Sequence, residues 1–321
     1  MFERRRWRAA GLLAGHLADR VFTDPVRGHP VAGFGWCANI LERFTYRDSR
    51  AAGAVHTGLL LTGLAVTGLA VQRIAGRGPA LALATAGATW VSLGGSSLAR
   101  TGGRLADLLA AGDVDEARGL LPSLCGRDPA ALDAAGLARA GLESVAENTS
   151  DAHVAPLLWA AVGGVPGVLV YRGVNTLDAM IGHRSPRYAR FGWAAARLDD
   201  IANYIAARVA GALVVMCAPV VDGSPAGAAR AWRRDAARHP SPNAGILEAS
   251  FAGALGVQLG GPTQYPHQLE MRPPLGDGPA PDVDDLRRAV RLSRLAQSAA
   301  LGVAVGLSAV GRTGRRVCSP R

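Results

Sequence analysis

The stretch 143–151, ESVAENTSD, gathers oxygen-bearing side chains that could bind a cation. Glu143 and Glu147 are four residues apart, so both carboxylates lie on one face if the stretch is helical. Like charges at that spacing repel each other, and a bound cation would reverse the penalty. Asn148 and Asp151 add oxygen ligands of the kind that Mg²⁺ prefers. The stretch is therefore a candidate cation site, although a solvent-exposed helix end with a polar cap has the same pattern.

A second stretch, 171–190, combines an amide and a carboxylate with several arginines. Asn175 and Asp178 are three residues apart, which again places them on one helical face. Arg172 and Arg184 offer guanidinium groups, which bind phosphate through two parallel hydrogen bonds. This combination points to a phosphorylated ligand.

Further polar residues come directly before an apolar segment. Arg197, Asp199 and Asp200 precede the apolar residues 201–221. Acidic side chains beside a membrane segment are costly unless they are paired, so they are candidates for a functional role.

The turn-forming stretch 239–245, HPSPNAG, contains Asn243 and is followed by Glu248 and by Leu-Gly-Gly-Pro at 259–262. Such turns can present backbone N–H groups to an anion. An ordinary surface turn fits the same residues equally well.

Several familiar catalytic motifs are missing from the sequence. It has no Walker sequence, no G-x-G-x-x-G after a predicted strand and no G-x-S-x-G nucleophile elbow. All 35 basic residues are arginine, so no lysine can form a Schiff base or serve a P-loop.

The composition indicates which elements must position these residues. Apolar residues make up 49% of the 321, charged residues only 19%, and mean hydropathy is +0.15, which excludes a disordered chain. The net charge of +10 lies in arginines that flank apolar stretches, without interleaved aromatics, which favours membrane-flanking charge over nucleic-acid binding. The four cysteines are too few and too scattered for a disulfide framework.

We therefore predict one all-α integral membrane domain over residues 1–321, a polytopic helical bundle of about four to six membrane segments. Polar helical loops between the segments form the site. The proline-rich stretch 262–281 reads as a loop. The apolar segments lie near 9–18, 55–75, 79–99, 154–170, 201–221 and 295–310.

The segment 154–170 is interrupted by Gly163, Gly164, Pro166 and Gly167. It either spans the membrane with a kink or enters and returns as two half-helices. The choice matters for the site. One membrane crossing here and one at 201–221 would put the polar stretch 171–200 on the opposite side of the membrane from 143–151 and 239–262. A single site therefore requires one of two arrangements. Either 154–170 and part of 201–221 are re-entrant, or the stretch 171–200 lies deep within the helical bundle.

Five blocks of the sequence together resemble one known family. They are LADRVFTDP…HPV (17–31), ESVAENTSD…APL (143–157), YRGVNTLDAMIGHR (171–184), FGWAAARLDDIANYIAAR (191–208) and SPNAGILEASFAGALGVQLGGP (241–262). In this order they resemble the CobD/CbiB family of cobalamin biosynthesis, adenosylcobinamide-phosphate synthase. One departure is Ala152-His153, where the family usually has glycine after ENTSD.

The resemblance implies a multi-pass enzyme of the cell membrane, the inner or plasma membrane, with its active site on the cytoplasmic side. Such an enzyme joins aminopropanol or its O-phosphate to the free propionate carboxyl of adenosylcobyric acid, in an amide-forming reaction driven by ATP with Mg²⁺. The implied partners are these substrates and membrane lipid, with other corrinoid-pathway enzymes as candidates and without nucleic acid.

The resemblance also suggests roles for the candidate residues. Glu147, Asp151 and Asp178 are the expected magnesium ligands, and they hold Mg–ATP with the amides of Asn148 and Asn175. Substrate or ATP contacts are also expected from Arg172, Arg184, Arg197 and Asn243. Asp199 or Asp200 is expected to accept the ammonium proton before attack, beside Glu147 and Asp178 as catalytic residues.

Two other functions fit parts of the sequence. A transporter for a corrinoid or another anion explains the apolar segments and the broken helix but gives the carboxylate–amide groups no purpose. A non-catalytic membrane scaffold that docks soluble pathway enzymes needs no ATP.

Overall fold

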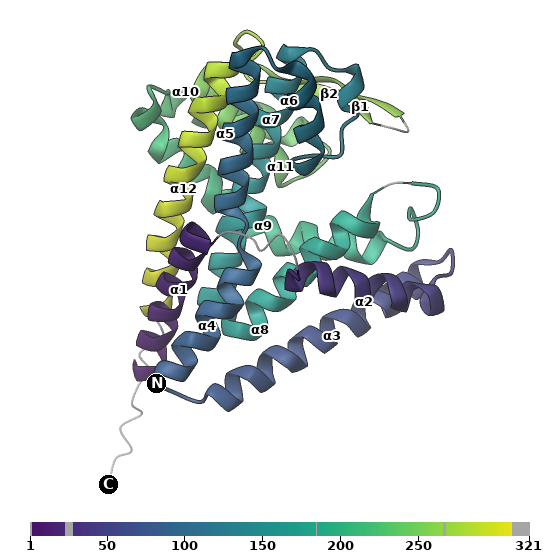
Figure 1. The fold of residues 1–321 in the computed structure, drawn as a ribbon, viewed down its shortest axis with the longest axis vertical. Helices are drawn as coiled ribbons and strands as arrows, with labels where there is room; N and C mark the ends of the chain where they lie inside the picture. The colour runs from purple at the N-terminus through teal and green to yellow at the C-terminus, as the bar shows by residue number, and fades with distance from the viewer. Residues whose placement is uncertain (1, 23–27, 184, 266–267, 310–321) are drawn as a thin grey trace.

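The computed structural model describes residues 2–22, 28–183, 185–265 and 268–309, and they are mainly helical (Figure 1). The helices are α1 (Phe2–Phe22), α2 (Pro30–Thr45), α3 (Arg50–Ala75), α4 (Pro79–Ser92), α5 (Gly95–Ala111), α6 (Val114–Leu120), α7 (Ala134–Thr149), α8 (Ala155–Leu177), α9 (Trp193–Cys217), α10 (Pro225–Asp235), α11 (Ala244–Leu255) and α12 (Val283–Ala309). Two π-helical turns, η3 (Ser150–Val154) and η4 (Asp178–Gly182), flank α8. The 3₁₀ turns are η1 (Leu121–Ser123), η2 (Pro129–Ala131), η5 (Ala218–Val221) and η6 (Ala236–Arg238).

One hydrophobic core holds most of these helices together. Its fully buried side chains come mainly from α5, α7, α8, α9, α11 and α12. A smaller apolar cluster, with Phe191 and Ile181 at its centre, joins α2 and α3 to η4 and the start of α9. The α2–α3 pair projects from the body of the molecule (Figure 1).

Three helical runs in the described residues are long and apolar enough to cross a membrane: Arg50–Ala75, Ala134–Gly182 and Trp193–Val221. In the first, only 17% of the most apolar 18-residue window is buried, so its apolar side chains face outward as in a lipid-facing helix. The helical architecture and the apolar runs agree with the expected all-α membrane protein. The expected apolar segment near 9–18 lies within α1, and residues 295–309 of the one near 295–310 lie within α12, while residue 310 lies outside the described residues.

Two expectations about single segments are wrong. Residues 79–99 do not form one helix, because α4 ends at Ser92 and α5 begins at Gly95 after the extended residue Leu93. The backbone N–H of Gly94 at this break donates to the carbonyl of Ala152, a tertiary contact that replaces a helical hydrogen bond.

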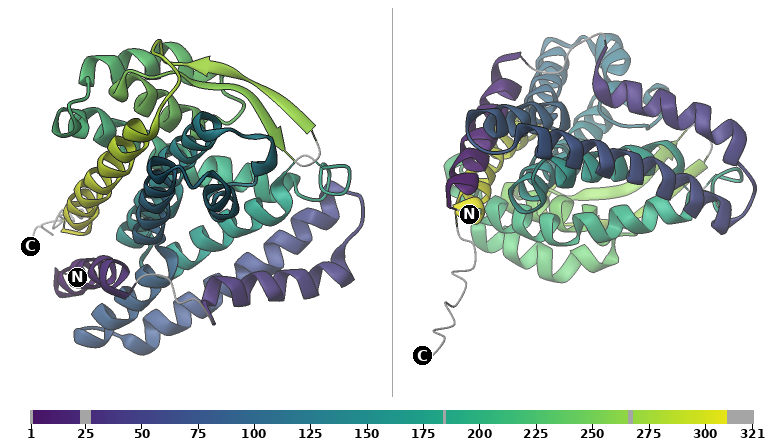
Figure 2. Two further views of the ribbon diagram at one scale, coloured as in Figure 1. Left: turned by 45° about the horizontal axis from the view of Figure 1, so that its top comes forward. Right: turned by 90° about the horizontal axis from the view of Figure 1, so that it is seen from below.

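The stretch 262–281 is not simply a loop. It contributes to an antiparallel hairpin of β1 (Leu259–Tyr265) and β2 (Gln268–Leu275), which contacts α10 and α11 (Figure 2). Its prolines did not prevent pairing because a two-stranded hairpin consists of edge strands, where a missing N–H is tolerated.

The broken segment 154–170 turns back on itself, as a re-entrant segment does. The break is at Gly164, whose φ of +66° lies outside the helical region. The Tyr171 hydroxyl donates to the carbonyl of Asp151 at 2.9 Å, whereas 20 residues of straight helix would extend about 30 Å. The Trp159 and Tyr171 rings stack with their centroids 6.4 Å apart. The halves of α8 are therefore antiparallel, which is the arrangement that the re-entrant alternative requires.

Side chains from two other helices satisfy the backbone groups freed at this break. Arg8 of α1 donates Nη1 to the carbonyls of Ala161 and Val162, at 3.1 and 3.2 Å. Gln72 of α3 accepts the N–H of Val165 through Oε1 at 3.2 Å. The turn therefore depends on tertiary contacts as well as on its own glycines and proline.

Replacing Gln72 by leucine should leave the N–H of Val165 without an acceptor and cost about 1–3 kcal/mol of unfolding free energy. The measurement is an SDS titration of the purified protein in mixed micelles. Gln72→Glu keeps the acceptor oxygen near Arg8 and should remain close to wild type. Equal stability of the leucine variant and the wild type would show that this hydrogen bond is dispensable.

Candidate functional site

The expected site residues meet where η3, the second half of α8, η4 and the start of α9 come together. Arg172 donates Nη1 to Asn175 Oδ1 at 3.4 Å, and Asn175 donates Nδ2 to Asp199 Oδ1, also at 3.4 Å. Asn203 donates to the other Asp199 oxygen at 3.0 Å. The Asp199 carboxylate is thus oriented by two amides, one from α8 and one from its own helix.

Tyr171 is the residue that ties these elements together. It is buried, and its hydroxyl lies 2.8 Å from Asn203 Oδ1 and 2.9 Å from the carbonyl of Asp151. One side chain therefore links α8, η3 and α9. Asn203 is itself fully buried, and it donates Nδ2 to Asp199, so Tyr171 also helps to fix the orientation of the Asp199 carboxylate.

The two π-helical turns carry two of the expected carboxylates, Asp151 in η3 and Asp178 in η4. π-Turns are rare and are frequent at functional sites. Glycine at 182 leaves room for the Asp178 carboxylate, because a Cβ built there would overlap it and force that side chain to move. No sequence signal had predicted these turns.

Negative charge is concentrated in this region. Glu147, Asp151, Asp178 and Asp199, which we call the carboxylate cluster, lie close enough to repel one another. Within the described residues, the carboxylates of Glu147 and Asp178 have no hydrogen bond or ion pair. A bound cation would relieve this repulsion.

A metal ion bound entirely by the protein does not fit the arrangement. Among the residues that the structure describes, no group of three or more His, Cys, Asp or Glu side chains is placed to hold one. Mg²⁺ commonly needs only one or two protein carboxylates and takes its remaining ligands from substrate phosphates and water. The unpaired carboxylates suit that second mode.

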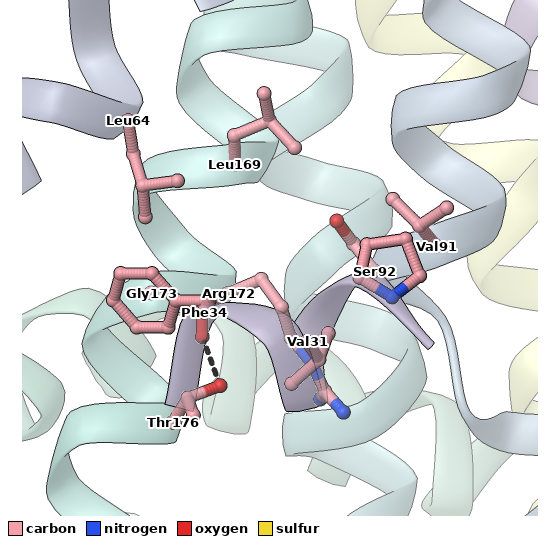
Figure 3. Close-up of a pocket in the computed structure, with 10 residues that line it drawn as sticks. Val31, Phe34, Leu64, Val91, Ser92, Leu169, Arg172, Gly173 and Thr176 are labelled. Carbon is pink, nitrogen blue, oxygen red and sulfur yellow. Dashed lines mark hydrogen bonds between the residues drawn. The ribbon is translucent and has the colours of Figure 1, made fainter. Parts of the chain in front are cut away.

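A polar cavity of about 240 Å³ lies beside the cluster. Three expected ligand-binding residues line it, Asn148, Arg172 and Asn175, together with residues of α5. Arg172 also lines a second, apolar cavity of about 80 Å³ bounded by Phe34 and Leu64 (Figure 3). Arg172 therefore lines both a polar and an apolar cavity.

The remaining expected residues lie at the edge of this region. Arg197 is paired with Asp200 at 3.2 Å, and both are partly exposed. Asn243 donates Nδ2 to the carbonyl of Asp200 at 2.9 Å. This hydrogen bond holds the stretch 239–245 against the start of α9. Arg184 lies outside the described residues. The antiparallel halves of α8 and the contact between Asn243 and Asp200 bring together described residues of the stretches 143–151, 171–200 and 239–245.

The structure also reveals a buried group of charged residues that we call the ion-pair cluster. Its members are Arg127, Glu143, His239, Glu248 and Arg272. Glu143 pairs with Arg127 and accepts the N–H of Gly260 at 2.7 Å. Glu248 Oε1 lies 3.4 Å from Arg272 Nη1 and 3.5 Å from His239 Nε2. Glu143, expected to face a cation with Glu147, is therefore neutralised by an arginine instead.

Sequence reasoning missed both arginines of this cluster. Arg127 comes from a connecting segment and Arg272 from β2, so neither has a spacing relation to the glutamates. The only signal was the polar turn at 239–245 with Glu248 after it, which could equally mark a surface turn.

Stability should fall as pH rises because of Glu248. Its burial raises the carboxyl pKa well above the usual value of 4.5, with added repulsion from Glu143 and Glu147, while Arg272 and Arg127 oppose this. Above pH 4.5 the unfolded state releases this proton and the folded state retains it, so stability is lost through the interval up to the folded pKa, at most about 1.4 kcal/mol per pH unit.

Glu248→Gln removes this titration. The unfolding free energy of the variant relative to the wild type should therefore increase between pH 5 and pH 8, measured by SDS titration at each pH. His239, whose pKa is lowered by burial, gives an opposite trend in both proteins, and the difference isolates the part that depends on Glu248. A constant difference across this range would contradict the prediction.

The fold and the site together define a helical membrane protein with a buried carboxylate–amide–arginine centre. The family described as CobD/CbiB protein matches residues 12–293, and the chain belongs to that family. It is 66% identical to the Mycobacterium tuberculosis (strain H37Rv) "Cobalamin biosynthesis protein CobD" over 94% of this chain and 96% of that one.

More distant relatives have the same name. The proteins of Geobacter metallireducens and Chromobacterium violaceum are each 42% identical, over 88% and 86% of this chain and 91% and 89% of theirs. No solved structure gives a significant match.

Proposed function

We propose that this protein acts in cobalamin biosynthesis as an adenosylcobinamide-phosphate synthase. It uses ATP to join the free propionate carboxyl of adenosylcobyric acid to the amine of aminopropanol or its O-phosphate. Membership of the CobD/CbiB family supports the pathway. The observation that carries the chemistry is the gathering of carboxylates, amides and Arg172 from three separate stretches beside one polar cavity.

The reaction needs carboxyl activation, because a carboxylate does not react with an amine spontaneously. The simplest route transfers a phosphoryl group from ATP to form an acyl phosphate, which requires neutralisation of phosphate charge. Arg172 is well placed for this role, since it lines the polar cavity beside Asn148 and Asn175. In the proposal Arg184 and Arg197 bind further phosphate oxygens.

Mg²⁺ supplies charge neutralisation for phosphoryl transfer. One or two of the expected ligands Glu147, Asp151 and Asp178 would hold it, with phosphate oxygens and water completing its coordination, since no three such side chains in the described residues are placed to bind one ion. The amides of Asn148 and Asn175 would bind the nucleotide phosphates from the cavity wall. Full turnover by a folded Asp178→Ala variant would exclude this role for Asp178.

Asp199 is the better of the two candidate bases. Its carboxylate is oriented by Asn175 and Asn203, whereas that of Asp200 is paired with Arg197. In the proposal Asp199 accepts a proton from the substrate ammonium, and the free amine then attacks the acyl phosphate, so that the C–N bond forms as the C–O bond to phosphate breaks and inorganic phosphate leaves.

In this proposal the protein is a multi-pass protein of the cell membrane, with its site open to the cytoplasm, where ATP and the corrinoid are found. Arg184→Cys and Pro242→Cys, in a background without the natural cysteines, should both be labelled by an impermeant thiol reagent from the cytoplasmic side. Labelling from opposite sides would contradict a single polar site.

A product assay on the detergent-purified protein tests the function. Adenosylcobyric acid, Mg–ATP and aminopropanol O-phosphate are supplied, and corrinoid mass and nucleotide products are followed together. Adenosylcobinamide phosphate with ADP would support the ligase and the acyl phosphate, while AMP would indicate an acyl adenylate. Folded protein that binds corrinoid without forming product would favour the scaffold or transporter.

A further inference from the structure

The polar cavity has a wall to which the proposed function gives no role. This wall comes from the start of α5, where Gly94, Ser97, Leu98 and Thr101 line the cavity. Residues three, four and seven apart share one face of a helix, so the four form a continuous surface that we call the α5 wall. The other walls include Arg172 and the two asparagines described above.

The α5 wall carries two hydroxyl groups that are available to a ligand. Serine and threonine within a helix often donate to the carbonyl four residues back, as Ser92 and Thr149 do at 2.8 and 2.7 Å. Within the described residues, neither Ser97 nor Thr101 makes this or any other hydrogen bond. Both hydroxyl protons can therefore be donated to a molecule in the cavity.

The break between α4 and α5 fixes this wall against η3. The N–H of Gly94 donates to the carbonyl of Ala152 at 2.9 Å, and Ala152 also lines the cavity. The next residue, Gly95, packs so closely on His153 that a Cβ built there would overlap the imidazole ring. The start of α5 is therefore held in place beside the rest of the site.

Charge and size indicate what the cavity holds. Of the described residues that line it, Arg172 alone is charged, so the lining favours an anion. Serine, threonine and asparagine side chains add neutral donors of the kind that contact phosphate oxygens. The volume of about 240 Å³ is below the roughly 300–1,000 Å³ of pockets that enclose drug-sized ligands. A phosphate chain suits this volume, whereas a whole nucleotide or a corrinoid does not.

We infer that Ser97 and Thr101 bind the phosphate chain of ATP, donating their hydroxyls to it from the α5 wall, while the nucleoside lies outside the cavity. The assignment rests on the proposed function. Asn148, in an adjoining wall, directly follows Glu147 in the chain. The bound phosphates therefore lie close to the carboxylates to which the proposed function assigns Mg²⁺.

Calorimetric titration of the full-length protein in detergent with Mg²⁺ tests the inference with three probes. They are a non-hydrolysable ATP analogue, inorganic triphosphate and aminopropanol O-phosphate. Ser97→Ala and Thr101→Val should each weaken binding of the first two about tenfold or more, because each removes a hydrogen bond to a charged oxygen. Binding of aminopropanol O-phosphate should not change. Thr101→Ser keeps the hydroxyl and should bind all three probes as the wild type does.

Ser123→Ala is the matched control. Ser123 also lines the cavity, but its hydroxyl donates to the carbonyl of Leu120 at 2.7 Å, so this variant should keep its affinity for the ATP analogue. In the product assay Ser97→Ala and Thr101→Val should raise the KM for ATP and leave the KM for the amine unchanged, a split that misfolding would not produce. Alanine favours a helix, so Ser97→Ala should fold, and the thermal midpoint shows whether it does.

The outcomes separate this inference from the proposed function. Wild-type affinity for the ATP analogue in the folded Ser97→Ala and Thr101→Val variants would overturn the α5 wall, as would a loss confined to aminopropanol O-phosphate or an equal loss in Ser123→Ala. If the wild type forms product and these variants keep its KM for ATP, the ligase stands and the α5 wall is wrong. Hydroxyl-dependent binding of the ATP analogue without product supports the α5 wall and counts against the ligase. No binding of the analogue by the wild type, with corrinoid and amine present, would contradict both.

Discussion

Replacing Asp199 by asparagine should lower the rate of amide formation by about 10²–10⁴-fold, the usual contribution of a general base. The change is nearly isosteric, and one of the two amides, Asn175 or Asn203, can still donate to the remaining side-chain oxygen. The fold should therefore survive while proton transfer fails. The measurement is kcat in the product assay, with the thermal midpoint as evidence of folding.

Asp200→Asn is the matched control for this prediction. The Asp200 carboxylate is 31% exposed and paired with Arg197, so it should contribute little to proton transfer. We expect a reduction in kcat of less than about tenfold, since exposed ion pairs contribute at most about 1 kcal/mol. Equal effects of the two substitutions, or full turnover by a folded Asp199→Asn protein, would remove Asp199 from the role of base.

Local spacing in the sequence was sufficient to predict the helical parts of the site. Glu143, Glu147 and Asp151 recur every four residues, and the structure places the two glutamates on α7 and Asp151 in the turn that follows. Periodicity shows which side chains share a face, but it does not show what the face contacts. The partner of Glu143 is an arginine from a separate segment, so the expected cation between the glutamates was not needed there.

The direction of the broken segment could not be predicted for a similar reason. Gly164 and Pro166 predicted an interruption of the helix, because glycine and proline disrupt the helical hydrogen bonds. Whether the second half-helix continues in the same direction or runs back depends on which side chains form hydrogen bonds with the backbone groups freed at the break. Arg8 and Gln72 do so from α1 and α3, and nothing near residue 164 in the sequence identifies them.

The hairpin was missed because its prolines and glycines resemble a loop. Its strands are stabilised by pairing with each other and by side chains that reach inward, such as Arg272 to Glu248. Such contacts between distant residues are not encoded in a local pattern. The ion-pair cluster depends on this hairpin, so it could not be predicted from the sequence.

Replacing Arg127 by methionine should destabilise the protein by about 3–5 kcal/mol, because it leaves the buried Glu143 carboxylate without its counter-ion. Both side chains are almost fully inaccessible, so water cannot compensate for the loss. The measurement is the free energy of unfolding by SDS titration in mixed micelles. Arg287→Met, which removes an exposed arginine paired with Asp107 and Asp284, should change the free energy of unfolding little, because solvent screens both ion pairs.

The double variant Arg127→Met/Glu143→Gln identifies the cause of that loss. Glutamine removes the stranded charge and keeps an oxygen that can accept the N–H of Gly260. If the uncompensated charge is the main cost, the double variant should regain most of the stability lost by the single one, since neutral replacements of buried ion pairs are often well tolerated. A double variant as unstable as Arg127→Met would show instead that the cost comes from the packing of the arginine side chain itself.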